Sequence, residues 1–193
     1  MKRYCLYLFI LIGISCSAEL KAQRNGTVYK GNDPAVRYTG RTLVSSDGSV
    51  AFDWVGTYLE TRFTGGKLSV KVSETGTSYY NVFVDGKLHK VVKVCGTDTL
   101  IHLVSGIDKR IHSLKIQKRS EGEFGKTTIH QFVLSGSGRL AEEPAVRTRH
   151  IEFIGNSLTC GYGTDGKHRD EPFLVETENC NLTFASMVAR YYD

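Results

Sequence analysis

The part of the sequence best suited to chemistry is a serine that follows a short apolar segment and lies among glycines. Residues 151–163 read IEFIGNSLTCGYG, so four residues of buried-strand type precede Gly155, Asn156 and Ser157. A strand that ends in a glycine-flanked serine can present the hydroxyl at the carboxyl-terminal edge of a parallel sheet, where open α/β folds bind their ligands. We interpret Ser157 as a candidate nucleophile, while a glycine-rich turn with a helix-capping serine would show the same pattern.

A serine hydroxyl becomes an effective nucleophile only when a base takes its proton and an oxyanion hole receives the developing charge. The backbone N–H groups near Ser157 could form part of that hole. His168 is the one histidine that follows Ser157 in the sequence, and Asp170 comes two residues later. Because triad partners normally come from separate strand ends, a local set of these three residues is a poor candidate. His150 precedes the apolar segment, at its opposite end, and is a poorer one.

Composition and charge narrow the class of protein. Hydrophobic residues make up 40% of the chain and charged residues 23%, as in an ordinary globular protein. The formal net charge is +5 without a block of Lys and Arg, which gives no case for nucleic acid as a partner. No Cys-x-x-Cys or Cys/His pair has the spacing of zinc ligands, so the sequence predicts neither a metal site nor another cofactor.

The N-terminus has the pattern of an export signal over residues 1–22. A basic start precedes an uncharged run, residues 4–17, and a polar stretch then ends at Ala22. The apolar run is shorter than the roughly 20 residues that a membrane span needs and fits the hydrophobic part of a signal peptide. We predict cleavage after Ala22, with a lipoprotein anchored at Cys16 as the alternative. Either way, the protein is expected to be secreted, periplasmic or on the cell surface.

Three cysteines, Cys95, Cys160 and Cys180, would remain after removal of the signal peptide and loss of Cys16, an odd number for an oxidising compartment. Cys160 and Cys180 lie 20 residues apart in the sequence. A disulfide between them would stabilise the fold by about 3 kcal/mol through loop entropy. Two small buried thiols are the alternative, and the sequence favours neither.

Residues 36–140 consist of short alternating segments separated by turn residues. In residues 68–72, LSVKV, the apolar side chains face one side of a strand and the polar ones face the other. Asp85 and Gly86 separate two such segments and favour a type I′ turn, which requires positive φ at both positions. This spacing predicts an antiparallel β-sandwich or jelly roll over residues 24–140.

Aromatic residues within the β-rich region allow two interpretations. Trp54, Tyr79 and Tyr80 could form a flat platform on which sugar rings stack. Alternatively they fill the core of the sandwich or form cross-strand pairs, which is the more common use of such residues. Three histidines within strand-like segments are interpreted as structural: His102, His112 and His130.

A compositional break follows the β-rich region, since residues 136–149 combine Gly, Pro and clustered charge. Such breaks are typical of domain boundaries. We therefore place a linker at residues 141–149, between the β domain of residues 24–140 and a C-terminal part of residues 150–193.

The C-terminal part has a different pattern. Residues 151–154 are expected to form a strand, and a polar loop follows the serine turn. The apolar positions of residues 181–192 have helical spacing, and Asn179 or Asn181 could cap that helix. Strand, loop and helix in this order form the first unit of an α/β sheet. A parallel strand needs neighbours on both edges, so we expect residues 150–193 to be poorly protected when no such neighbours are present.

Taken together, these segments resemble carbohydrate esterase family 2, whose members join an N-terminal jelly roll to an SGNH (GDSL-type) hydrolase domain. The serine block looks like the first conserved block of SGNH hydrolases, and the β-rich segments are similar to the family's jelly roll. The similar segments extend in order over nearly the whole chain after the signal peptide: residues 37–41, 52–56, 60–65, 80–86, 125–134, 151–163 and 177–179.

The resemblance implies an acetylxylan esterase-like enzyme that deacetylates xylan or related plant polysaccharides without a metal or organic cofactor. Ser157 corresponds to the nucleophile, and its backbone N–H corresponds to one oxyanion donor. Gly155 and Asn156 correspond to the structural part of the block, where Asn156 replaces the usual aspartate. That aspartate mainly organises the turn, so the replacement leaves the interpretation of Ser157 unchanged.

The same resemblance predicts a C-terminally truncated enzyme. The remaining oxyanion donors and the general-base histidine of such hydrolases belong to later blocks, which have no counterpart before Asp193. We therefore expect the fold to be mainly β, a jelly roll followed by the start of an incomplete α/β domain, and the fragment to be inactive. The alternative is a non-catalytic β-sandwich module that binds carbohydrate. The oligomeric state is not predicted.

Overall fold

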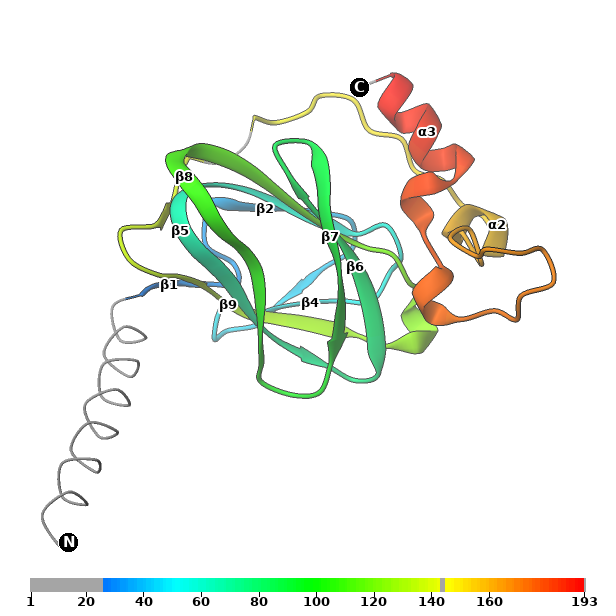
Figure 1. Ribbon diagram of the computed structural model, residues 1–193, viewed down its shortest axis with the longest axis horizontal. Helices are drawn as coiled ribbons and strands as arrows, with labels where there is room; N and C mark the ends of the chain where they lie inside the picture. The colour runs from blue at the N-terminus through cyan, green and yellow to red at the C-terminus, as the bar shows by residue number, and fades with distance from the viewer. Residues whose placement is uncertain (1–25, 143–144, 193) are drawn as a thin grey trace, which may run out of the picture.

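The computed structural model describes residues 26–142 and 145–192. The predicted signal peptide and Cys16 lie outside the described residues. In the first range the chain is almost entirely β, as Figure 1 shows. Its strands are β1 (Thr27–Lys30), β2 (Val36–Thr39), β3 (Leu43–Val44), β4 (Val50–Phe52), β5 (Tyr58–Glu74), β6 (Thr77–Val84), β7 (Lys87–Cys95), β8 (Thr99–Lys118), β9 (Thr127–Leu134) and β10 (Arg139–Leu140), with a short 3₁₀ helix, η2 (Gly122–Phe124), before β9.

All strand pairs in the described residues are antiparallel, in the order β3-β4-β9-β5-β8-β6-β7. Three short strands join the edges of this path, since β1 pairs with β9 and both β2 and β10 pair with β5. This topology confirms the prediction of a mainly β, jelly-roll-like fold.

Two long strands, β5 and β8, belong to both layers of the sandwich. They contain 17 and 20 residues, and their pairing is interrupted by register shifts between Thr64 and Ser69. Before these irregularities β5 pairs with β2 and β10, and after them it pairs with β9. Because irregularities of this kind bend a strand, one continuous strand can serve both layers.

The core lies between the layers and follows the predicted alternation. Leu68, Val70 and Val72 of β5 are buried, and Phe63 and Phe132 are completely inaccessible. The turn between β6 and β7 also agrees with the sequence, since Asp85 has φ 50° and Gly86 has φ 75°. Positive φ at both positions is what a type I′ turn requires.

The aromatic and histidine residues mostly have structural contacts. Tyr80 is buried, packs edge-on to Phe52 and shares a hydrogen bond with Thr127, so it cannot belong to an exposed sugar-stacking platform. Trp54 is 57% exposed, and the Arg41 guanidinium lies 5.1 Å from the centre of its ring system. The histidines contact polar groups of adjacent strands or turns: His102 with Ser69, His130 with Ser73, and His112 with Asp85 and Asp108.

The described residues of the C-terminal part contain four short helical elements: α2 (Ser157–Cys160), η3 (Val175–Thr177), η4 (Cys180–Leu182) and α3 (Phe184–Tyr191). In Figure 1 they lie on one side of the β-sandwich. The predicted helix is confirmed as α3, although Thr183 precedes it without a side-chain cap, while Asn179 accepts a hydrogen bond from the Asn181 N–H at the start of η4. No helix in the described ranges is long and apolar enough to cross a membrane.

The predicted strand at residues 151–154 is wrong for this structure. These residues have no regular secondary structure, and Ile154 is 93% exposed. The physical reason is that a β-strand is completed by pairing with a neighbour, and residues 151–154 pair with none of the described strands.

Candidate functional site

Ser157 is the first residue of α2, within a turn that the surrounding residues define closely. The Asn156 side chain caps the helix by accepting a hydrogen bond from the Leu158 N–H at 3.3 Å. The backbone carbonyl of Ser157 accepts hydrogen bonds from the N–H groups of Gly161 and Tyr162, each at 3.0 Å. Ser157 itself is exposed to solvent. The cap is therefore Asn156 and not the serine, which differs from the alternative of a helix-capping serine, and the turn leaves Ser157 accessible.

Two glycines of the block are required by close approaches. A Cβ on Gly155 would lie 2.1 Å from Thr159 Oγ1, inside any allowed contact. Gly161 ends α2 in the left-handed region with φ 87°, and a Cβ there would lie 2.5 Å from backbone atoms of Asn179. These contacts explain why glycine is needed where the helix begins and where it ends.

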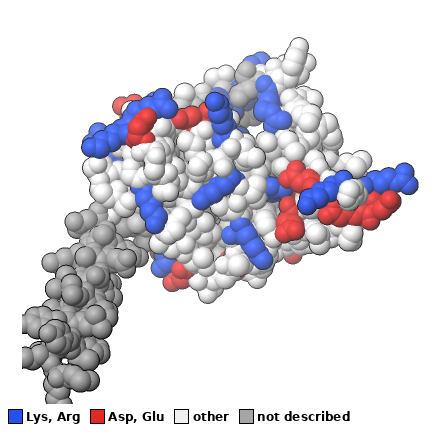
Figure 2. Space-filling view, viewed as in Figure 1, with Lys and Arg blue, Asp and Glu red and all other residues white. Residues whose placement is uncertain are grey.

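No general base lies beside Ser157 in the part of the chain that the structure describes. No hydrogen bond connects its hydroxyl to His168 or Asp170 across the described residues, and both of those residues lie in an exposed loop. Figure 2 shows acidic and basic side chains interspersed over the visible face, with a dense group of both over the loop between α2 and η3. The described residues therefore place an accessible hydroxyl at a helix start and no proton-transfer group beside it.

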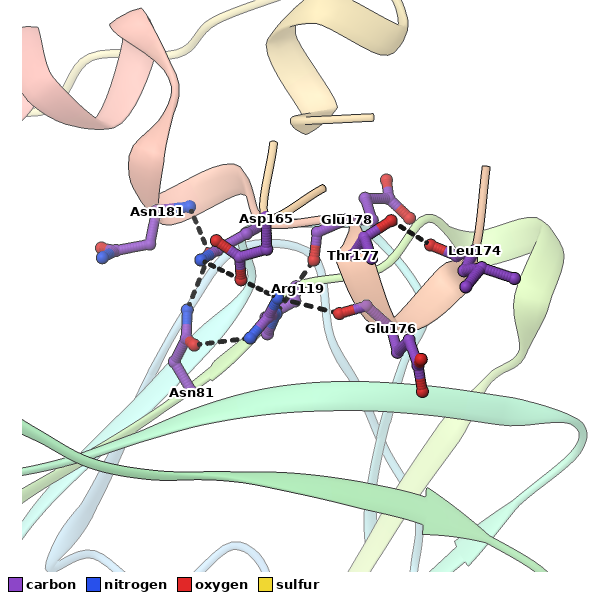
Figure 3. A network of polar contacts seen from close by, with 9 residues as sticks. Asn81, Arg119, Asp165, Leu174, Glu176, Thr177, Glu178 and Asn181 are labelled. Atoms are coloured by element: carbon purple, nitrogen blue, oxygen red, sulfur yellow. Dashed lines mark hydrogen bonds and ion pairs between the residues drawn. The ribbon is translucent and has the colours of Figure 1, made fainter. Parts of the chain in front are cut away.

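A buried arginine, Arg119, joins the C-terminal part to the sandwich (Figure 3). It follows β8 and is only 2% exposed. Its Nε donates to the Glu178 carbonyl at 2.9 Å and its Nη2 donates to the Glu176 carbonyl at 3.0 Å. Nη2 also forms an ion pair with Asp165. One cationic side chain thus satisfies backbone and carboxylate groups from two separate segments of the C-terminal part.

Two asparagines extend this network. Asn81 Nδ2 in β6 donates to Asn179 Oδ1 at 3.0 Å, and Asn179 Nδ2 donates to Asp165 Oδ2 at 3.1 Å. The Asn179 N–H in turn donates to the Gly161 carbonyl at 2.9 Å. A continuous path of hydrogen bonds therefore runs from the sandwich to the end of α2, the helix that begins at Ser157.

These contacts divide the C-terminal part into two regions. Residues 178–180 and Gly161 are buried against the sandwich, whereas residues 154–158 are exposed. The expectation that the whole of residues 150–193 is poorly protected stays a prediction, but the packing now restricts it to the exposed segment and to α3. No pattern in the sequence pointed to Arg119, while Asn81 and Asn179 belong to segments that the family resemblance had already identified.

Cys160 and Cys180 are both free thiols in the structure, so the proposed disulfide is not formed here. Burial raises the pKa of each to about 12, and carboxylates of Glu121 and Glu178 add to the rise at Cys160. The Cys180 thiol donates to the Lys118 carbonyl at 3.3 Å. Cys180 is thus a buried thiol and Cys160 a half-buried one, and neither thiol has the low pKa of a reactive cysteine.

Burial also shifts two ionisable groups at the junction. Lys118 is fully buried and its ammonium group donates to Ser78, and burial lowers its pKa to about 8. Glu178 is fully buried as well, and burial raises the pKa of its carboxyl group to about 7. Glu121, Cys160 and Glu178 each bring a potential metal-ligand atom within 4.8 Å of the others.

Comparisons with known proteins identify relatives of this chain. The family model described as "Carbohydrate esterase 2 N-terminal" matches residues 38–144. The chain is 33% identical over 82% of its length to the cellulase/esterase CelE of Acetivibrio thermocellus, of which it covers 19%. It is 29% identical over 69% of its length to an acetylxylan esterase / glucomannan deacetylase of Cellvibrio japonicus, of which it covers 37%.

A solved structure shows the same fold. A family two carbohydrate esterase from Clostridium thermocellum, in complex with cellohexaose, superposes with a TM-score of 0.77 and 33% identity, over 81% of this chain and 48% of that one. The chain thus spans less than half the length of each of these relatives.

Proposed function

Because the chain belongs to the carbohydrate esterase 2 N-terminal family, we propose that it is the N-terminal part of a secreted esterase that deacetylates xylan or related plant polysaccharides. In this proposal residues 1–22 are a signal peptide, residues 24–140 an accessory jelly roll and residues 141–149 a linker. Residues 150–193 begin an SGNH hydrolase domain. The relatives named as acetylxylan esterases support the substrate class.

The observation that carries the proposal is the position of Ser157. Its hydroxyl is exposed at the start of α2, and the first N–H groups of a helix have no intrahelical partner. In the proposed reaction the hydroxyl attacks the acetyl carbonyl, the sugar oxygen leaves, and water then releases acetate from the acyl-serine. The Ser157 N–H is one donor to the oxyanion, which a preorganised N–H stabilises.

The remaining machinery would come from outside the described residues. No base faces Ser157 among them, and two large apolar side chains close to it in the chain are exposed, Ile154 at 93% and Leu158 at 76%. Exposed apolar surface of this extent commonly marks a surface that another part of a protein covers. We propose that further hydrolase elements cover it and supply the general base, and that this chain alone does not turn over substrate.

The test is acetate release from acetylated xylan by the chain joined to the downstream coding sequence of its gene. We expect activity in the joined protein, its loss in Ser157→Ala, and no activity in the 193-residue chain. Ser137→Ala is the matched control, because Ser137 is also exposed and lies in a loop of the sandwich. Activity that survives Ser157→Ala would rule out the proposed nucleophile.

One observation favours a second function, carbohydrate binding by the sandwich itself. Trp54 exposes 57% of its surface next to Arg41, and flat aromatic faces suit sugar rings. Isothermal titration of the chain with xylan and glucomannan oligosaccharides tests it, with Trp54→Ala as the variant. Heat that is absent in both proteins would exclude this function.

A further inference from the structure

Three side chains that lie far apart in the sequence converge at the junction between sandwich and C-terminal part. Glu121 precedes η2, Cys160 is the last residue of α2, and Glu178 follows η3. One potential ligand atom from each lies within 4.8 Å of the other two. Glu121 and Cys160 are half-buried and Glu178 is fully buried, so the group is partly shielded from solvent.

A second observation is that one carboxylate oxygen of this site has no hydrogen-bond partner. Glu178 Oε2 accepts a hydrogen bond from the Glu121 N–H at 3.1 Å, whereas Glu178 Oε1 is buried without any hydrogen-bond partner. A buried carboxylate oxygen without a donor is costly and calls for an explanation, such as a bound ion. The free oxygen belongs to the same carboxylate whose neighbours are Glu121 and Cys160.

Neither Lys118 nor Arg119, the cationic residues nearby, donates a hydrogen bond to this oxygen. Lys118 attracts Glu178 electrostatically, but its ammonium group donates to Ser78. Arg119 donates to the backbone carbonyl of Glu178 and not to its carboxylate. Glu121 and Glu123 repel the Glu178 carboxylate, and its raised pKa has the same origin as that of the Cys160 thiol, namely burial beside other acidic groups.

We propose that Glu121, Cys160 and Glu178 bind a divalent transition-metal cation, and that Zn²⁺ suits this donor set best. Zinc takes thiolate and carboxylate ligands together, commonly with four ligands in tetrahedral geometry, so water or a further protein group would complete the site. Magnesium and calcium prefer oxygen ligands alone. On binding, the metal–sulfur bond forms as the thiol proton leaves to solvent, and any proton on Glu178 leaves with it.

The site would have a positioning role. Cys160 is the last residue of α2 and Ser157 is the first, so a metal bound to Cys160 and Glu121 would tie this helix directly to the sandwich. This role rests on the proposed function of Ser157, whereas the metal site itself does not. Failure of Zn²⁺ binding and failure of acetate release are therefore separate results.

The experiment uses the chain with Cys95→Ser, which removes the exposed thiol among the described residues, under reducing conditions. Isothermal titration with ZnCl₂ should give one ion per chain with proton release, and Co²⁺ should give a thiolate charge-transfer band. Cys160→Ser should abolish that band. Glu178→Gln and Glu121→Gln should each weaken Zn²⁺ binding by at least about tenfold, since even outer-shell changes cost that much. The unsubstituted chain, which retains Cys95, is the control for the Cys95→Ser substitution. It should also bind one ion and show the same cobalt–thiolate band.

Three results would overturn the proposal. The first is the absence of stoichiometric Zn²⁺ binding, and the second is a cobalt band that persists in Cys160→Ser. The third is a Cys160–Cys180 disulfide in the protein as exported by its host, detected by mass spectrometry after thiol alkylation, because a bridged Cys160 cannot ligate. Glu121→Gln keeps the test decisive if Glu178→Gln does not fold, since Glu121 is only half-buried.

Discussion

Replacing Arg119 with alanine is expected to release the C-terminal part from the sandwich without unfolding the sandwich. The arginine is 2% exposed and donates to the carbonyls of Glu176 and Glu178 at 3.0 and 2.9 Å, besides its ion pair with Asp165. The variant would remove the donor from all three acceptors, of which the Glu178 carbonyl belongs to a fully buried residue. The free energy that holds the C-terminal part in place should therefore fall.

The magnitude follows from the number and kind of these bonds. A hydrogen bond to a charged group contributes about 1.5–3 kcal/mol, and two such bonds reach the backbone carbonyls. Removing one partner of a buried ion pair costs about 3–5 kcal/mol. The Asp165 side chain is 33% exposed and can regain water, which places the expected loss at about 3 kcal/mol, near the lower end of that range. A loss of this size is at least about 100-fold in the opening equilibrium.

Amide hydrogen exchange measures this opening residue by residue. The informative amides are those of Asn179, bonded to the Gly161 carbonyl, and of Asp165, bonded to the Thr177 carbonyl. In Arg119→Ala both should exchange at least about 100-fold faster, while the central amides of β5 keep their protection.

Arg110→Ala is the matched control. Arg110 also pairs with aspartates, but 70% of its side chain is exposed, and exposed ion pairs contribute little to stability. Unchanged exchange at Asn179 in Arg119→Ala would refute the reasoning. Equal loss of protection throughout β5 would also refute it, because Arg119 would then stabilise the sandwich itself.

Three further predictions concern single residues. Gly161→Ala should destabilise the chain by at least about 1 kcal/mol, because the φ of Gly161 is 87° and a Cβ there would lie 2.5 Å from backbone atoms of Asn179. The measurement is the melting temperature, which should be lower in the variant, and an unchanged value would contradict the prediction. A hydrogen bond from His112 lowers the pKa of Asp85 below the ordinary 3.8, so the ionised carboxylate stabilises the fold above that pH and this contribution is lost below it. Asp85→Asn should therefore reduce the acid sensitivity of the free energy of unfolding in urea titrations, and an equal pH dependence in the variant would refute this prediction. Burial raises the pKa of Glu178 from 4.5 to about 7, so the folded state keeps the proton to a higher pH than the unfolded state does. The stability of the metal-free chain should therefore fall as pH rises from about 4.5 to about 7. Glu178→Gln should flatten this dependence of stability on pH, and a dependence that persists in the variant would exclude Glu178 as its source.

The sequence by itself determined the features that depend on neighbours along the chain. The alternation of Leu68, Val70 and Val72 predicted which face of β5 is buried, and Asp85-Gly86 predicted the turn between β6 and β7. The helix at the C-terminus followed from its apolar spacing. Strand alternation, tight turns and helix periodicity are local properties, so a linear pattern is enough to predict them.

Only the tertiary structure decided the features that depend on distant partners. Residues 151–154 have the composition of a strand but form none, because pairing comes from another strand and none of the described ones adjoins them. Arg119 has no motif around it, yet it satisfies groups in two separate segments of the C-terminal part. The cluster of Glu121, Cys160 and Glu178 arises from residues up to 57 positions apart. Contacts of this kind are created by folding, since each side chain meets its partners only after the sandwich brings their segments together.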